Sequence, residues 1–419
     1  MKTTTLSLIL LLILSGTIRA QKINDWRPEN RTGVSAETGL MKSWPEAGPT
    51  LLWSNLDLAS GYSSPSFGTK AIYITGTKDT VDILYALSME GKILWQTVMG
   101  RAWKGSNNPE SRATPTVEDN KVYTCSGNGG LACIDATNGK IIWSYKASEL
   151  NKGTFGRWGI AESLLIDGDK IYFSPGGPET MTIALNKATG NVIWKSPSLN
   201  DKPGYASPIL INYAGKKMVI GVSLGHIFGV DASNGEILWK VAHEQSSDPN
   251  LRVFELIKCT TPLYKDGMVY VTGGYDTGGM MVKIGEDGKS ATVAWTDPVL
   301  DDHHGGVVLV NGYIYGSNWL NNSNGNWCCI NWKTGKKMWE EHWNTKGSII
   351  SAEGMLYLYD ERQGNVGLLR ANPEKFDLVS SFKVNQGDAG PYWAHPVIHN
   401  GTLYLRHTNA LMAYNIKAK

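Results

Sequence analysis

The sequence predicts an all-β protein, an eight-bladed β-propeller whose blades are four-stranded antiparallel sheets. Three observations predict this fold: a short unit that recurs along the chain, a tyrosine-centred strand before each copy of it, and two chain ends that complement each other. No segment after residue 20 has the periodicity of an amphipathic helix. With 47 glycines, 42% hydrophobic residues and only 19% charged ones, the chain has the composition of a turn-rich folded protein.

The recurring unit is eleven residues long and ends in tryptophan. Its clearest copies are CIDATNGKIIW, ALNKATGNVIW, GVDASNGEILW and CINWKTGKKMW. The aspartate or asparagine can accept a hydrogen bond from the backbone two residues later, and the glycine supplies a positive φ, so a tight turn between two outer strands is expected here. The tryptophan would cover apolar area between adjacent blades. Seven tryptophans take this structural place: Trp53, Trp95, Trp143, Trp194, Trp239, Trp295 and Trp339.

Upstream of each unit, a turn leads into an apolar strand that is centred on tyrosine in seven cases and on valine in one. The eight central residues are Tyr73, Tyr123, Tyr172, Val219, Tyr270, Tyr315, Tyr357 and Tyr404. Each repeat therefore offers four strand-like runs separated by turn residues, which is the content of a propeller blade. Repeats of about 40 to 50 residues are typical of such folds.

The chain ends indicate how the ring closes. Residues 393–419 lack the terminal tryptophan strand, whereas residues 49–54, PTLLWS, carry an orphan one. The two pieces complete one blade, which leaves no open sheet edge to invite aggregation. We therefore expect a single propeller over residues 49–419 and an N-terminal leader, residues 21–48, laid over its outside.

Residues 1–20 have the pattern of a secretory signal peptide: Lys2, an apolar stretch and Ala20 at the cleavage site. Removal of Lys2 and Arg19 leaves equal numbers of basic and acidic residues, so no nucleic-acid partner is expected. No later apolar run approaches the roughly 18 residues that span a bilayer, and no cysteine near the cleavage site offers a lipid anchor. We expect a monomer, periplasmic or secreted, without a transmembrane segment.

Five cysteines are too few for a disulfide framework, and the number is odd. Cys125 and Cys133 flank a glycine-rich turn and could face each other across a hairpin, an alternative that the sequence leaves open. The remaining cysteines are Cys259, Cys328 and Cys329.

The repeat resembles the tryptophan-docking motif of the eight-bladed quinoprotein dehydrogenase superfamily, the pyrroloquinoline quinone (PQQ) repeat proteins. The resemblance covers residues 49–419. It implies the fold, and it implies one of two branches: alcohol or sugar dehydrogenases that hold PQQ with calcium, or cofactor-free relatives such as the propeller lipoprotein of the outer-membrane β-barrel assembly machinery.

Departures from the dehydrogenase branch lead us to expect no bound PQQ, with PQQ plus calcium as the alternative. Cys328 and Cys329 look like the vicinal disulfide of the alcohol-oxidising enzymes, but Cys329 aligns with Cys133, inside the third strand of a blade. No set of Glu, Asn and Asp calcium ligands assembles in one register. The lipid-anchor cysteine of the other branch is also missing.

Topology locates the candidate ligand site. The linkers between blades and the loops between second and third strands share one face, and counting back eleven residues from each central position, with three more in the fourth blade, reaches a ring at the channel mouth. The ring is Tyr62, Arg112, Ala161, Tyr205, Cys259, His304, Lys346 and Trp393. The linkers add Trp103, Arg157, Trp158, Glu162, Arg252, His303, Tyr392 and His395, and the loops add His226, Trp319, Asp360 and Arg362. The predicted ligand-binding residues are Tyr62, Arg112, Trp158, Tyr205, His304, Trp319, Lys346, Trp393 and His395.

Aromatic rings beside charged groups suit a polar, ring-shaped ligand such as a sugar or a quinone; the alternative is that these residues only fill a solvated mouth. No metal site is expected, because His303 and His304 would point to opposite faces of an extended chain. GVSLG, residues 221–225, has the spacing of a nucleophile elbow but lacks the helix that must follow it.

Two classes of function remain. The first is an exported binding platform, for a small polar ligand, a glycan or a protein partner on the loop face, resembling the outer-membrane assembly propeller. The second is an enzyme: a PQQ-dependent alcohol or sugar dehydrogenase, or a carbohydrate-active enzyme that uses His304, Tyr205 and Arg112 as base, acid and charge stabiliser.

Overall fold

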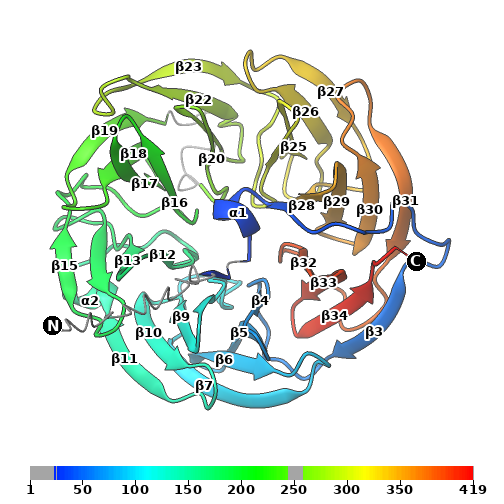
Figure 1. Cartoon of the computed structure of the whole chain (residues 1–419), viewed down its shortest axis with the longest axis horizontal. Coiled ribbons are helices and arrows are strands. Elements are labelled where there is room, and N and C mark those ends of the chain that lie inside the picture. The colour runs from blue at the N-terminus through cyan, green and yellow to red at the C-terminus, as the bar shows by residue number, and fades with distance from the viewer. Residues whose placement is uncertain (1–22, 25, 244–257, 419) are drawn as a thin grey trace, which may run out of the picture.

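The computed structural model describes residues 23–24, 26–243 and 258–418; the expected signal peptide and Arg252 lie outside them. The described strands form eight sheets around a central axis (Figure 1). Seven blades use four consecutive strands, which pair antiparallel in chain order from the axis outward. The eight-bladed prediction is confirmed.

The first blade consists of β4 (Ser66–Phe67), β5 (Ile72–Lys78), β6 (Val81–Leu87) and β7 (Ile93–Arg101), and the second of β8 (Thr116–Glu118), β9 (Lys121–Cys125), β10 (Gly130–Asp135) and β11 (Ile141–Lys146). The third blade consists of β12 (Leu165–Asp167), β13 (Lys170–Phe173), β14 (Ile183–Asn186) and β15 (Val192–Lys195), and the fourth of β16 (Ile209–Tyr213), β17 (Lys216–Val222), β18 (His226–Asp231) and β19 (Ile237–Ala242). A one-turn helix, α2 (Ala147–Leu150), follows β11.

The fifth blade consists of β20 (Leu263–Lys265), β21 (Met268–Thr272), β22 (Gly279–Ile284) and β23 (Ala291–Asp297). The sixth consists of β24 (Val308–Val310), β25 (Tyr313–Ser317), β26 (Trp327–Asn331) and β27 (Lys337–Glu341). The seventh consists of β28 (Gly347–Ala352), β29 (Met355–Asp360), β30 (Asn365–Arg370) and β31 (Asp377–Lys383).

The eighth blade joins the two ends of the chain. Its inner strands are β32 (Val397–His399), β33 (Thr402–His407) and β34 (Ala410–Asn415), and its outermost strand is β3 (Thr50–Asn55). β3 runs antiparallel to β34, with Thr50 opposite Asn415 and Asn55 opposite Leu411. The predicted closure is therefore confirmed.

Five of the outer-strand tryptophans dock on a glycine in a turn of the neighbouring blade. The Trp143 Nε1–H donates to the carbonyl of Lys187, 2.9 Å away, and the Trp143 ring lies against Gly190 in the turn of the next blade. A Cβ on Gly190 would lie 2.8 Å from that ring, and Gly190 has φ +74°. The pairs Trp53–Gly91, Trp95–Gly139, Trp194–Gly235 and Trp295–Gly335 repeat this contact. The glycine of the unit therefore serves the turn and also makes room for the tryptophan.

A pair of glycine substitutions separates these two roles. Gly354 has φ +75° but no neighbour within 4 Å of an added Cβ. Gly354→Ala is expected to lower the free energy of unfolding by about 1 kcal/mol, the cost of the left-handed backbone alone. Gly190→Ala is expected to cost about 3 kcal/mol, because the Trp143 ring must also move. Equal losses in urea denaturation would contradict this role for the glycine.

The leader occupies the channel, so the expectation that it lies over the outside is wrong for its first part. β1 (Ile23–Asn24) extends the innermost strand β8, and β2 (Val34–Ser35) pairs parallel with β28. Between them α1 (Pro28–Arg31) sits at the centre of the ring in Figure 1. Only then does the chain run outward to β3, where Trp44 packs on Phe382 at 5.2 Å.

Two buried arginines hold the leader in place. Arg27 donates to the carbonyl of Val307, 2.7 Å away. Arg31 donates to the carbonyls of Ser163, Leu164 and Pro208, at 3.1, 2.8 and 2.8 Å. Buried carbonyls without a donor cost free energy, and charged donors make strong hydrogen bonds. The arginines therefore connect the leader to three different blades.

Arg31→Met keeps most of the side-chain volume but leaves three buried carbonyls without their donor. We expect the free energy of unfolding to fall by about 2–4 kcal/mol in urea denaturation. Arg101→Met, at an exposed position at the end of β7, is the matched control and is expected to change stability by less than about 0.5 kcal/mol. A similar loss in both variants would argue against the anchoring role.

Candidate functional site

A pocket of about 390 Å³ lies at the centre of the ring, and every blade contributes to its wall. Most lining residues precede the innermost strands of seven blades. Tyr275 and Asn322 lie between the second and third strands of two of these blades, and Glu361, between β29 and β30, comes from the remaining blade. Six aromatic side chains line it: Trp26, Tyr62, Trp158, Tyr205, Tyr275 and Trp393. The pocket therefore stands where the inter-blade linkers converge.

Seven of the nine predicted ligand-binding residues line this pocket: Tyr62, Arg112, Trp158, Tyr205, His304, Trp393 and His395. The other two stand behind the wall. Trp319 stacks on the lining residue Tyr275, with ring centroids 4.7 Å apart, and Lys346 is buried against Glu361. Of the remaining predicted mouth residues, Ala161, Cys259 and His303 line the pocket, whereas Trp103, Arg157, Glu162, His226, Asp360, Arg362 and Tyr392 do not.

The sequence analysis missed ten lining residues, among them one charged side chain, Glu361, and two large aromatic ones, Tyr275 and Trp26. Tyr275 lies in the loop between β21 and β22, the same class of loop that holds Trp319, so its loop position was a usable signal. Glu361 lies between two residues that were assigned to the mouth, Asp360 and Arg362. Trp26 belongs to the leader, which has no repeat register, and nothing in the sequence places it in the channel.

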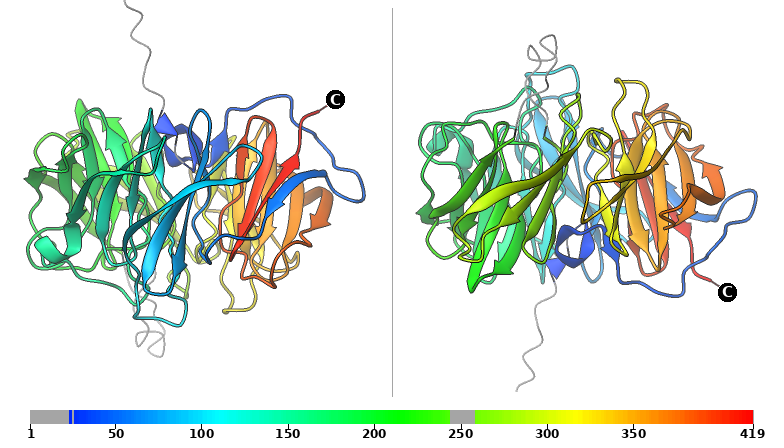
Figure 2. Two further views of the ribbon diagram at one scale, coloured as in Figure 1. Left: turned by 90° about the horizontal axis from the view of Figure 1, so that it is seen from below. Right: turned by 90° about the horizontal axis from the view of Figure 1, so that it is seen from above.

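Among the described lining residues, Trp26 is the one that comes from the leader and not from a blade, and we call it the floor of the pocket. The leader enters the ring from the face on which α1 is seen in Figure 2, and Trp26 meets His395 edge to face at 4.7 Å. Arg27 Nη1 lies 3.2 Å from His395 Nδ1, so Nδ1 accepts and the Nε2–H donates to the carbonyl of His304 at 2.8 Å. Burial, together with Arg27, lowers the pKa of His395 to about 3. His395 is thus a neutral connector between the floor and the wall.

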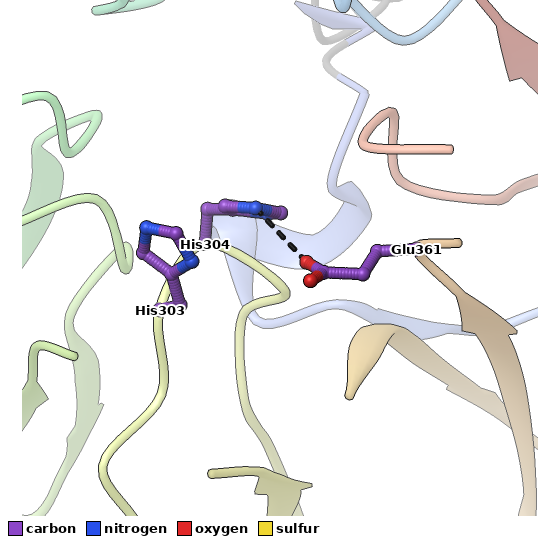
Figure 3. Close-up of side chains that lie close together, drawn as sticks. All are labelled: His303, His304 and Glu361. Carbon is purple, nitrogen blue, oxygen red and sulfur yellow. Dashed lines mark ion pairs between the residues drawn. The ribbon is translucent and has the colours of Figure 1, made fainter. Parts of the chain in front are cut away.

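A charged cluster occupies one side of the wall (Figure 3). His304 Nε2 lies 3.2 Å from Glu361 Oε2, and Lys346 Nζ lies 2.6 Å from Glu361 Oε1. The His303 ring lies against that of His304, at 4.3 Å between centroids. Burial would raise the pKa of Glu361, but His304 and Lys346 together lower it below its ordinary value.

Two buried aspartates brace the loop that carries the histidines. Asp301 accepts hydrogen bonds from the backbone N–H groups of Asp276 and Gly278, both at 2.8 Å. Asp302 accepts from Gly306 N–H at 2.9 Å and from the hydroxyl of Thr260. Because these bonds bend residues 301–306, the two imidazoles share one side of the loop. The reason for expecting no metal, an extended chain at His303 and His304, therefore does not hold.

Arg112 stands on another part of the wall. Its guanidinium lies 5.4 Å from the centre of the Tyr62 ring and donates to the carbonyls of Glu110 and Asn108 at 2.8 and 2.6 Å. No ion pair of Arg112 with a carboxylate occurs among the described residues. Burial lowers the pKa of Arg112. Because no carboxylate of the described residues pairs with the guanidinium, its positive charge is available to a ligand.

An aromatic series joins Arg112 to the charged cluster. Tyr62 packs on Trp393 at 4.8 Å, and Trp393 meets His304 at 5.5 Å. Another pair, Trp158 and Tyr205, meets edge to face at 5.9 Å. The pocket therefore offers flat apolar faces together with a cation, a carboxylate and imidazoles.

Comparison with known proteins places the chain in a family. Residues 77–341, more than half of the chain, match the family described as outer membrane protein assembly factor BamB. The chain belongs to this family of PQQ-repeat propellers. BamB of Moranella endobia is 23% identical over 69% of this chain and 73% of its own length.

Solved structures and dehydrogenases are similar as well. The crystal structure of BamB from Moraxella catarrhalis matches with a TM-score of 0.61 at 16% identity, over 88% of this chain and 99% of that one, which shows the fold. The quinoprotein alcohol dehydrogenase PedH of Pseudomonas putida is 28% identical over 32% of this chain, a stretch that spans only 23% of the dehydrogenase. Among the described residues, no helix has the length and apolar character needed to cross a membrane.

The resemblance to the dehydrogenases implies that a calcium-bound quinone would need a vicinal disulfide and a set of Glu, Asn and Asp ligands. The pocket residues do not fit this set. Cys328 and Cys329 are unpaired and lie in β26, the third strand of its blade, where they pack into different clusters on opposite faces. Glu361 is the one acidic residue on the described lining, and no aspartate accompanies it. Cys125 and Cys133 are also unpaired, since the register sets Cys125 opposite Leu131 and Cys133 opposite Tyr123.

Glu162, which lies outside the pocket, is expected to make the stability of the protein depend on pH. Its Oε2 accepts from the Ser174 N–H at 3.3 Å. Burial raises the pKa of Glu162 to about 8, although Arg31 of the leader acts to lower it. Since the folded pKa exceeds the unfolded one, this group's stabilising contribution is present at acidic pH and is lost as the pH rises through about 8.

Glu162→Gln should therefore flatten the pH dependence of stability. Between pH 5.5 and 9, the wild-type protein is expected to lose roughly 1–3 kcal/mol more free energy of unfolding than the variant. Urea denaturation at the two pH values measures this difference. Parallel losses in both proteins would show that Glu162 is not buried as an acid.

Proposed function

We propose that this protein is an exported periplasmic propeller that binds a small polar, ring-shaped ligand, a sugar in the first instance, in its central pocket. The observation that carries the proposal is the composition of the wall, where Arg112 forms no ion pair with a carboxylate of the described residues and lies over the ring of Tyr62, which packs on Trp393. Aromatic faces stack on the apolar faces of sugar rings, while fixed polar groups bind their hydroxyls.

The shape of the pocket supports a small molecule rather than a long segment of a partner. Its volume of about 390 Å³ is within the usual range of ligand pockets, roughly 300–1,000 Å³. The leader also lies in the channel, with α1 at the centre of the ring (Figure 1) and Trp26 on the pocket lining. The signal-peptide pattern of residues 1–20 supports export, and the family description, outer membrane protein assembly factor, is consistent with a location in the cell envelope.

A protein partner is the second candidate. It is favoured by the name of the family, outer membrane protein assembly factor, which matches residues 77–341. Such a partner would bind the loop face around the pocket. It would be insensitive to competition by small ligands, which separates the two candidates.

Thermal shift of the mature protein with a panel of mono- and oligosaccharides, and separately with PQQ plus Ca²⁺, tests the proposal. A ligand that binds only the folded state at about 100 times its Kd stabilises by roughly 2.7 kcal/mol. We expect a rise in Tm with at least one saccharide. Silence with every saccharide, or a calcium-dependent rise with PQQ alone, would overturn the sugar proposal, and the second result would favour the dehydrogenase branch.

Substitutions locate the binding site. Arg112→Ala and Trp393→Ala are expected to weaken saccharide binding at least about tenfold, because each removes a group that faces the pocket. Arg362→Ala, exposed and outside the pocket, is the control and should bind as wild type. Unchanged affinity in all three variants would place binding elsewhere.

A further inference from the structure

The charged cluster has the composition of a metal site. One ligand atom each of His303, His304 and Glu361 can be chosen so that all three lie within 4.8 Å of one another. They come from the linker before β24 and the loop after β29, two neighbouring blades. We propose that these three side chains bind a divalent transition-metal ion, with zinc as the first choice.

The spacing fits with small adjustments. Zinc bonds of about 2.0–2.1 Å in a tetrahedron separate ligand atoms by about 3.3 Å. His304 Nε2 and Glu361 Oε2 are already 3.2 Å apart, and the cluster as a whole places one ligand atom of each of the three residues within 4.8 Å of the others. Two imidazoles and one carboxylate form a common ligand set for zinc and for other first-row divalent ions.

The ligand atoms are poorly satisfied by the fold. His303 Nδ1, both ring nitrogens of His304 and Glu361 Oε2 are shielded from solvent and make no hydrogen bond among the described residues, and the contact between His304 Nε2 and Glu361 Oε2 at 3.2 Å is an ion pair only. Buried polar atoms without partners cost free energy. A bound ion would satisfy the carboxylate oxygen and one nitrogen of each imidazole.

Neighbouring side chains hold the three metal ligands in place, as the residues around the ligands of a bound metal ion do. Lys346 holds Glu361 Oε1 at 2.6 Å and itself donates to the carbonyl of Asn321 at 2.9 Å, so Oε2 remains for the ion. His395 donates to the carbonyl of His304, and the aspartates brace the same loop from behind. Such outer contacts tune metal affinity, often by 10–100-fold.

Three protein ligands leave a coordination position open toward the pocket, which all three of these side chains line. Zinc sites of this kind bind water or a ligand oxygen at the open position. The metal site stands whether or not the pocket takes a sugar, because its ligands are protein groups alone.

Metal binding is measured directly on the mature protein without an affinity tag. After treatment with a chelator and dialysis against limiting Zn²⁺, we expect one equivalent of zinc per chain by elemental analysis, and absorption bands of coordinated Co²⁺ upon substitution. Less than a stoichiometric amount of zinc, or Co²⁺ spectra of the hydrated ion, would overturn the proposal. No organic ligand enters this measurement, so its failure and that of the sugar proposal are distinguishable.

Variants separate a metal site from a hydrogen-bonded ion-pair network. His303 is not part of the ion pairs that join His304, Glu361 and Lys346, so His303→Ala leaves that network intact. We expect His303→Ala to weaken zinc binding at least about 100-fold, more than a lost outer-shell contact would. His303→Gln, which keeps more volume, serves if the alanine variant does not fold.

His226→Ala is the matched control. His226 lies in β18, where it contacts Asp201 at 3.1 Å, and it is not a member of the cluster. Zinc affinity should be unchanged in this variant. Equal affinity in the His303 variants and the wild-type protein would show adventitious binding and overturn the assignment.

Discussion

The contact between an outer-strand tryptophan and the glycine turn of the next blade is the interaction on which the rest of the structure depends. A four-stranded blade cannot bury both of its faces alone, so it needs a neighbour at a fixed angle. The tryptophan supplies the apolar area, and the glycine allows close approach, as at Trp143 and Gly190. This contact recurs at five of the blade interfaces, and closure of the ring brings the linkers between the blades to one axis.

The leader provides hydrogen-bond partners for backbone groups at the centre of the ring. Propeller channels expose the ends of the innermost strands, whose backbone groups need partners. Here β1 and β2 extend two of those strands, and Arg27 and Arg31 bind carbonyls at others. The same segment places Trp26 under the pocket. The stability of the channel and the shape of the pocket therefore have one cause.

The pocket combines groups that a purely structural channel does not need. Three features all cost desolvation: Arg112, which pairs with no carboxylate of the described residues, two adjacent imidazoles, and a buried carboxylate. Braces from Asp301, Asp302, Lys346 and His395 hold these groups in place. Buried polar groups that are positioned at such cost mark functional sites more often than filler. This is the physical basis on which we propose that the pocket, rather than the outer rim, binds the ligand.

Prediction from the sequence worked where local chemistry repeats. The Asp-to-Gly turns, the outer tryptophans and the central tyrosines recur at a fixed spacing, and this register alone located Tyr62, Arg112, Tyr205 and Trp393 on one ring. The chain closure was predictable as well, because the two ends carry complementary parts of one blade. Each of these features depends on neighbours in sequence or on an identical repeat.

Features without a repeat register were decided by the tertiary structure alone. The leader was expected outside, yet two arginines bury themselves among carbonyls of different blades, and no local pattern encodes such partners. His303 and His304 were expected to diverge, yet buried aspartates bend their loop, and Glu361 reaches them from the next blade. The sequence by itself determined the scaffold and the ring of linkers, because these follow from local spacing. Only the tertiary structure decided where Trp26 lies and that His303 and His304 meet Glu361, because these positions depend on contacts between residues far apart in the chain.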